Sequence, residues 1–277
     1  MLHVKPLEDS EADEQVIALY SKIRDAFKLD TTPLFFQYMG RFPDFLEYIW
    51  GSIEKNIERE SFWKLSDACK STCLALFSDA YVPSVTAQSM IKELISRDTS
   101  SHFISAKLKN LSQTNAAIAL LFVAMREAVK GWALSTKLLK DKYEDARYDR
   151  VTQSVEKEVE TSIMEDASNI QLSRNTEQFD YVKFMVLVQS EVDDSQKKES
   201  HLHARLALEE YLVENCQKVE IDLTYRTLAE YAQNYKNFDE LVYLLSESFP
   251  TIAATRVIVS SIGTILLTSP LAGRVDS

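Results

Sequence analysis

Apolar residues recur along this chain at the spacing of an α-helix. The first such set consists of Val16, Tyr20, Ile23 and Phe27. Intervals of three and four residues place these side chains on one helix face, which predicts an amphipathic helix after Asp13. Similar sets follow through most of the sequence, and no segment alternates apolar and polar residues as a half-buried strand does. The pattern therefore predicts an all-α protein.

Local residues predict where several of these helices begin. Thr32 and Pro33 form a good start, with threonine as the N-cap and proline at the first helical position. Ser84 is expected to cap a helix that ends near residue 95. Further helices are expected over residues 45–57, 62–77, 103–111, 113–125, 155–163, 179–192, 202–219, 224–235 and 237–248. The stretch 113–125 is apolar on all sides, which predicts a central, buried helix.

The order of the helices indicates a duplicated unit. In each half, two short helices precede a final apolar helix, and a charged stretch separates the halves. We therefore expect a first helical repeat over residues 1–134, a charged linker over 135–151 and a second helical repeat over 152–277. The two repeats are expected to pack as a pseudo-symmetric pair.

The end of the chain carries local signals of its own. Asn237 and Glu240 have the spacing of a capping box. Phe249 and Pro250 are expected to end the helix that this box begins, because proline disrupts a helix interior. The apolar stretch 257–268 is too short and too rich in hydroxyl groups to span a bilayer alone, so it is interpreted as a core helix.

The run from Phe179 to Val188 carries one carboxylate and one ammonium among apolar residues. A helix that is apolar on nearly every face is buried, and a carboxylate there stays ionised only where donors or a cation compensate the lost hydration. In one interpretation, Asp180 and Lys183 form an ion pair that reaches solvent. In the other, Asp180 is a functional carboxylate.

Composition supports the prediction of helices and disfavours some classes of binding partner. Gly and Pro number 5 and 6 among 277 residues, well below the usual shares of about 7% and about 5%. The formal net charge of −11 disfavours nucleic acid and anionic membrane as partners, because both require a basic surface. The start of the chain lacks an apolar signal segment, and three cysteines fit free thiols, so we expect a cytoplasmic protein.

Cysteine and histidine spacings indicate neither a metal site nor a redox centre. Cys69 and Cys73 would share one helix face, but they are not a Cys-x-x-Cys pair and no histidine follows closely. His201 and His203 would point to different helix faces, which is a poor arrangement for zinc. No phosphate loop, nucleotide fingerprint or nucleophile elbow is present. We therefore expect no metal and no organic cofactor.

Two segments of the chain, residues 19–24 and 32–50, resemble the group I 2-haloacid dehalogenases. The likeness consists of a proline-bearing helix start, an apolar pair, and then the segment Phe42–Leu46 followed by Trp50. Members of this family are all-α, with two related helical repeats and the active site between them. They remove halide from short 2-haloacids by attack of an activated water, without a covalent ester. The helical units are expected to resemble the alkylhydroperoxidase-like class, without its redox cysteines.

The resemblance implies roles for two residues, and the chemistry of a 2-haloacid suggests roles for three more. Asp180 falls at the place of the family's water-activating aspartate, and Asn115 at the place of an asparagine that begins the central helix. A carboxylate within about 3 Å of a water can take its proton, and an amide can hold that water in line. Phe35 and Phe36 would form an apolar wall for the carbon–halogen group. The carboxylate of the substrate would be bound by a helix N-terminus or by an arginine such as Arg174.

Each of these residues also has a simpler interpretation. Asn115 would cap a helix, Phe35 and Phe36 would be ordinary core, and Arg174 would be solvated. The sequence departs from the family's pattern just after the asparagine, at residues 116–118. The second hypothesis is therefore a helical relative that has lost the chemistry and binds a small ligand or a protein partner. A homodimer is left open.

Overall fold

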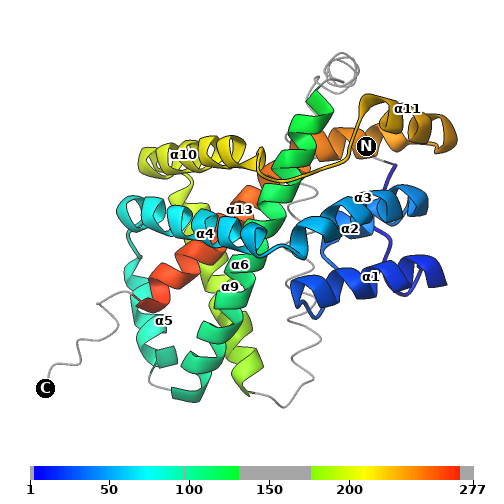
Figure 1. The fold of residues 1–277 in the computed structure, drawn as a ribbon. Coiled ribbons are helices and arrows are strands. Elements are labelled where there is room, and N and C mark those ends of the chain that lie inside the picture. Colours follow the sequence, from blue (N-terminus) through cyan, green and yellow to red (C-terminus); the bar gives the residue numbers. More distant parts are fainter. Residues whose placement is uncertain (1–2, 96–97, 131–175, 269–277) are drawn as a thin grey trace, which may run out of the picture. The chain divides into compact units, whose positions relative to one another are not determined.

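The protein is built from α-helices, which confirms the predicted fold class (Figure 1). The computed structural model describes residues 3–95, 98–130 and 176–268, and within these ranges every regular element is a helix. The elements are α1 (Glu14–Phe27), α2 (Leu34–Met39), α3 (Pro43–Ile57), α4 (Glu60–Ala80), α5 (Val85–Ile95), α6 (Asp98–Val129), α9 (Thr176–Ser195), α10 (Glu199–Cys216), α11 (Tyr225–Asn234), α12 (Phe238–Tyr243), the π-helical turn η2 (Leu244–Ser248) and α13 (Phe249–Thr268).

The helices group into two compact units, and each unit is assembled from three separate stretches of chain. The described parts of unit 1 are residues 3–64, 118–130 and 213–252, and those of unit 2 are residues 65–95, 98–117, 176–212 and 253–268. Each unit therefore takes helices from both sides of the expected repeat boundary. The predicted linker at 135–151 and the predicted helix at 155–163 lie outside the described residues, and the pseudo-symmetric pairing stays a prediction.

Helix α1 forms as its sequence pattern predicts. The Asp13 side chain accepts a hydrogen bond from the Val16 backbone N–H at 2.9 Å, which caps the first turn. The apolar face is buried, with Tyr20 and Ile23 both at 0% exposure. The helix ends at Phe27, and the C-cap Lys28 has a φ of 55°, the left-handed conformation common at helix C-termini.

Helix α2 begins one residue later than its sequence suggests. Pro33 occupies the N-cap position, and no side chain caps the helix. The Thr32 hydroxyl instead accepts a hydrogen bond from Arg24 Nη1 at 2.8 Å. The prediction of a threonine cap is therefore wrong, because a side chain distant in sequence engages that hydroxyl.

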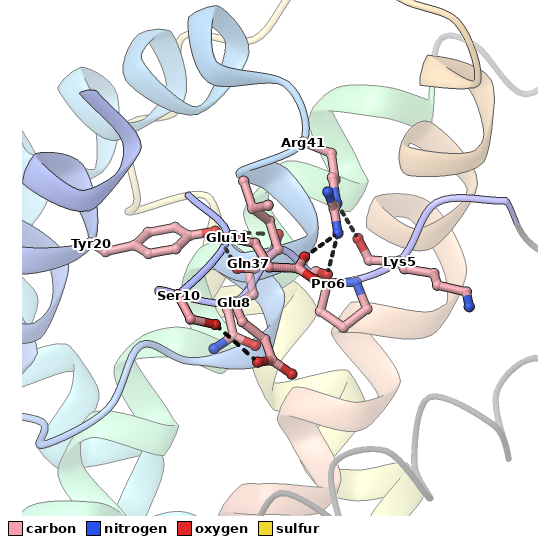
Figure 2. Close-up of polar contacts among 9 residues, drawn as sticks. Lys5, Pro6, Glu8, Ser10, Glu11, Tyr20, Gln37 and Arg41 are labelled. Atoms are coloured by element: carbon pink, nitrogen blue, oxygen red, sulfur yellow. Dashed lines mark hydrogen bonds and ion pairs between the residues drawn. The ribbon is translucent and has the colours of Figure 1, made fainter. Parts of the chain in front are cut away.

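The N-terminal segment is fastened to unit 1 by Arg41, as Figure 2 shows. The Arg41 guanidinium donates to the carbonyl oxygens of Lys5, at 3.2 Å, and Pro6, at 3.0 Å. It also forms an ion pair of 2.9 Å with Glu11. Since backbone carbonyls of consecutive residues bind one guanidinium, this extended segment has a defined path over the helices.

A buried glutamate holds the start of the same segment. Glu240 is 3% exposed, and its carboxylate accepts the backbone N–H groups of His3 at 2.6 Å and Val4 at 2.9 Å. The predicted capping box is therefore wrong, because Glu240 binds these donors instead. Asn237 is the N-cap of α12 but makes no side-chain cap, since its φ of 63° places it in the left-handed region.

Helix α6 replaces two helices that the sequence predicted separately. It runs without a break for 32 residues, from Asp98 to Val129. The polar residues that suggested an interruption are compatible with a helix, as Ser112 donates to the Leu108 carbonyl within the helix at 2.8 Å. The expected burial of its central apolar stretch is confirmed, since residues 116–125 are all buried.

Pro250 does not end a helix. α12, η2 and α13 follow one another without a gap. In a regular α-helix the proline ring would clash with the carbonyl four residues earlier, and the wider π-helical turn at Leu244–Ser248 changes that register just before it. The helical stretch Phe238–Thr268 is long and apolar enough to span a membrane by composition, although 56% of its most apolar window is buried inside the protein.

Helix α9 is buried on one side only. Phe184 and Val188 are at 0% exposure, whereas Val186 is 40% exposed. The expectation of a helix buried on nearly every face is therefore wrong. Asp180 nevertheless lies on its buried side, with 1% exposure.

Candidate functional site

Asp180 is bound at the first turn of α6. The Ser100 hydroxyl donates a hydrogen bond of 2.7 Å to Asp180 Oδ2, and both groups are buried within unit 2. Ser100 is the third residue of α6, and the N-terminus of a long helix carries a partial positive charge that stabilises a carboxylate. The hydroxyl and the helix end both stabilise a carboxylate in the interior.

Lys183 lies apart from the interior. Its side chain is exposed, and its ammonium lies 4.6 Å from the centre of the Phe179 ring on the same helix. This is a cation–π contact between residues four apart. Asp180 is buried rather than at the surface, so the predicted solvent-exposed ion pair with Lys183 does not describe it.

Asn115 lies in the interior of α6 and connects it to α13. It is 5% exposed, and its Nδ2 donates to the backbone carbonyl of Arg256 at 3.1 Å. Because α6 begins at Asp98, Asn115 is seventeen residues into the helix and cannot cap it. The predicted capping role is therefore wrong, and the amide instead stabilises the contact between α6 and α13 in unit 2 (Figure 1).

Asp180 and Asn115 are separated along α6. Ser100, which binds Asp180, and Asn115 are fifteen residues apart on one unbroken helix. At 1.5 Å per residue this is a rise of about 22 Å, far beyond the reach of a serine and an asparagine side chain. The structure therefore does not bring the two predicted catalytic residues to one water molecule.

Phe35 and Phe36 are fully buried in the aromatic core of unit 1. The centroid of the Phe35 ring lies 4.8 Å from that of Phe122 and 5.3 Å from that of Phe249. The ring centroids of Phe36 and Trp50 are 6.4 Å apart. Both phenylalanines are at 0% exposure. This packing supports the core interpretation, and their role in substrate binding stays a prediction.

Arg174 lies outside the described residues. A different arginine, Arg256 on α13, accepts a hydrogen bond from Asn115 through its backbone carbonyl. The sequence analysis did not predict a role for it. Burial lowers the pKa of Arg256 to about 10, which still leaves it charged at neutral pH. The signal that could have identified it is a single charge in the otherwise uncharged helix Phe249–Thr268.

Glu191 is a second buried carboxylate of unit 2, and it has a structural role. It accepts a hydrogen bond of 2.5 Å from the Tyr81 hydroxyl and one of 3.0 Å from the Ser84 backbone N–H. Burial, reinforced by this carboxylate, raises the pKa of Tyr81 well above its ordinary value. Ser84 in turn caps α5 by accepting the Ala87 N–H at 3.0 Å, which confirms the predicted cap. Glu191 therefore holds the start of α5.

Two cysteines and one histidine of unit 2 are buried. Burial raises the pKa of the Cys69 and Cys73 thiols to about 12 each, so neither is a thiolate at neutral pH. His201 pairs its Nδ1 with the Ser195 hydroxyl at 2.8 Å and packs edge-on against Phe77. Burial lowers the pKa of His201. Among the described residues, no group of three or more potential ligands is placed to hold a metal ion.

Comparison with known proteins identifies a protein of similar fold but no family to which the chain belongs. Neither the protein-family models nor the curated proteins give a match. The structure is similar to the crystal structure of a D-2-haloacid dehalogenase mutant, with a TM-score of 0.61 and 10% sequence identity. The similarity covers 96% of this chain and 97% of that one. At this identity the likeness establishes a shared fold over nearly the whole length of both chains.

Proposed function

We propose that this chain is a small-ligand-binding protein of the haloacid dehalogenase fold that does not displace halide through Asp180 and Asn115. The proposal rests on the distance of about 22 Å along α6 between Ser100, which binds Asp180, and Asn115. Displacement of halide by water needs one water that contacts the base at about 3 Å and is held in line with the carbon. Two side chains so far apart cannot share that water.

Both polar residues also have contacts that explain their burial without catalysis. Asp180 accepts the Ser100 hydroxyl at the start of α6. Asn115 donates to the α13 backbone. Buried polar groups are normally hydrogen-bonded in this way, so neither residue requires a substrate to account for its position.

A hydrolytic 2-haloacid dehalogenase with Asp180 as its base is the second candidate. It is favoured by the similarity to a D-2-haloacid dehalogenase over nearly the full length of this chain. It is also favoured by a carboxylate that is 1% exposed on α9, since buried carboxylates are common at active sites. In this alternative a residue other than Asn115 would have to orient the water.

Halide release separates the two candidates. The purified chain is incubated with D- and L-2-chloropropionate at neutral and mildly alkaline pH, and chloride is measured against a protein-free blank. We expect no release above the blank from either isomer.

Release that is lost in Asp180→Asn would overturn this proposal in favour of the dehalogenase. The variant must retain its helical circular dichroism for that result to count. Asp193→Asn is the matched control, because Asp193 is an exposed aspartate on the same helix and its loss should leave any release unchanged.

A further inference from the structure

Helix α10 (Figure 1) carries apolar side chains on two opposite faces. Its inner face is buried in unit 2 and includes Ala204, Leu208 and Leu212. Leu202 and Leu206 precede Ala204 and Leu208 by two residues, which is a rotation of about 200° around the helix axis. Each of these two outer leucines is 48% exposed. A surface helix normally has polar residues on its outer face, so two exposed leucines one turn apart need an explanation.

The chain after α4 adds apolar surface next to the start of α10. The Ser200 hydroxyl donates to the Ala80 carbonyl at 3.0 Å, which fixes the end of α4 beside the first turn of α10. Val82 and Val85 follow Ala80 directly in the chain, and both are exposed. In the part of the chain that the structure describes, seven large apolar side chains are exposed, and these two valines and the outer leucines are four of them. Gathered apolar side chains, unlike single ones, are a mark of an interaction surface.

The charges of α10 are divided along its length. The first half of the helix, with residues 196–198 before it, has one acidic residue, Glu199, and three basic residues: Lys197, Lys198 and Arg205. The second half, residues 207–216, has three glutamates and no basic residue. Two such helices that lie side by side in opposite directions therefore place opposite charges next to each other. A parallel arrangement would place glutamates beside glutamates, which is unfavourable.

Ion pairs within one copy do not use up these charges. Arg205 pairs with Glu209 at 2.9 Å, and Lys197 pairs with Asp194 at 2.8 Å. Both pairs lie at the surface, where an ion pair contributes little to stability. A carboxylate has two oxygens and accepts several hydrogen bonds, so each glutamate can also bind a cation of a second molecule.

We propose that two copies of this chain associate through α10, with the two helices antiparallel and the outer leucines of each copy packed against those of the other. A dimer with two-fold symmetry needs a surface that is complementary to itself. The outer leucines supply the apolar part of that surface, and the divided charge supplies the polar part. The inference concerns a protein partner and does not depend on the proposed ligand-binding function.

The molar mass of the intact chain in solution tests the proposal. Sedimentation velocity is measured over a series of protein concentrations. We expect a species of twice the chain mass of 31.7 kDa that dissociates on dilution. A single species of the chain mass at every concentration would overturn the proposal.

A substitution on the outer face assigns the surface. Leu206→Gln should raise the dissociation constant of the dimer about tenfold or more, because two leucines leave the apolar contact. The variant should keep its helical circular dichroism, since Leu206 is exposed in the single chain. Val186→Gln is the matched control, because Val186 is a 40% exposed apolar residue of the same unit on α9. Unchanged association of Leu206→Gln, or an equal loss in Val186→Gln, would overturn the assignment to α10.

A pair of charge reversals tests the antiparallel direction. Lys198 and Glu210 are both exposed and are twelve residues apart, which is about 18 Å along a helix, too far for contact within one copy. Lys198→Glu and Glu210→Lys should each weaken association about threefold, because each places like charges together across the dimer. The double variant should restore the affinity of the unchanged chain. A double variant that is as weak as the two single losses combined would contradict antiparallel pairing and overturn the proposal.

Discussion

Ser100 forms a hydrogen bond that stabilises the buried carboxylate of Asp180. Its hydroxyl is 2.7 Å from Asp180 Oδ2, and both residues are almost fully buried. A buried carboxylate that loses a donor retains its desolvation cost without the compensating bond. The stability of unit 2 should therefore respond to the serine as well as to the aspartate.

Ser100→Ala tests this dependence. We expect the free energy of unfolding to fall by about 1–3 kcal/mol, the usual cost of removing a hydrogen bond to a buried charged group. Urea denaturation followed by circular dichroism measures the change. Ser101→Ala, on the next and less buried position of α6, should change stability by less than about 0.5 kcal/mol. Equal losses in the two variants would contradict a specific role for the Ser100 hydroxyl.

The sequence could predict that Asp180 is buried but not what binds it. Its apolar neighbours signal burial through local pattern alone. Ser100 is 80 positions away in sequence, and no local rule connects the two. Arg256 was detectable as a lone charge in an apolar stretch, but its depth and its proximity to Asn115 depend on how α13 packs against α6.

At the scale of elements, helix ends were predictable where the cap is local. Ser84 caps α5 as its sequence predicts, and α1 begins directly after Asp13 as expected. The predictions failed where a distant group was involved. Thr32 binds Arg24, and Glu240 binds the N-terminal segment instead of its own helix. Pro250 suggested a break because proline disrupts a regular helix. The π-helical turn before it, which accommodates the proline, has no simple sequence signature.

The short loop after α2 depends on a glycine. A Cβ placed on Gly40 would lie 2.0 Å from the hydroxyl oxygen of Tyr20. That hydroxyl donates to the Leu7 carbonyl at 3.0 Å, and Tyr20 is fully buried. The tyrosine therefore cannot move aside without breaking its hold on the N-terminal segment.

Gly40→Ala should consequently destabilise the protein. Inserting a methyl group into this close contact is expected to cost about 1–3 kcal/mol, measured as a shift of the urea unfolding midpoint. Gly51→Ala is the matched control, because no atom lies within 4 Å of its added Cβ inside α3. That change should stabilise the helix by about 0.5–1 kcal/mol. Stabilisation by both alanines would show that the Tyr20 contact does not restrict residue 40.

At the scale of the whole molecule, the compact units do not follow the order of the sequence. Unit 1 combines α1 to α3 with the end of α6 and with α11, α12 and η2. Within unit 1, Ser52 and Asn56 on α3 bind the segment before α11, where Asn56 Nδ2 donates to the Glu220 carbonyl at 2.7 Å. Partners more than 160 positions apart therefore complete the same core.

This arrangement predicts that neither expected repeat folds alone. Residues 1–134 and 152–277, expressed separately, should lack a cooperative thermal transition, because each would expose apolar faces that the other half covers within the units. Equimolar mixing should restore such a transition. Circular dichroism and calorimetry provide the measurement, with the intact chain as reference. A cooperative transition in either fragment alone would contradict the prediction.

The composition of unit 1 also sets the order of events during synthesis. Helix α3 ends at Ile57, but the segments that complete its unit extend to Ile252. Ribosomes add roughly 5–20 residues per second, so the nascent chain carries the first three helices for roughly 10–40 s before their last partner emerges. During that interval α1 and α3 lack the part of their core that residues 213–252 supply. We therefore expect the newly made chain to complete its first unit only late in translation.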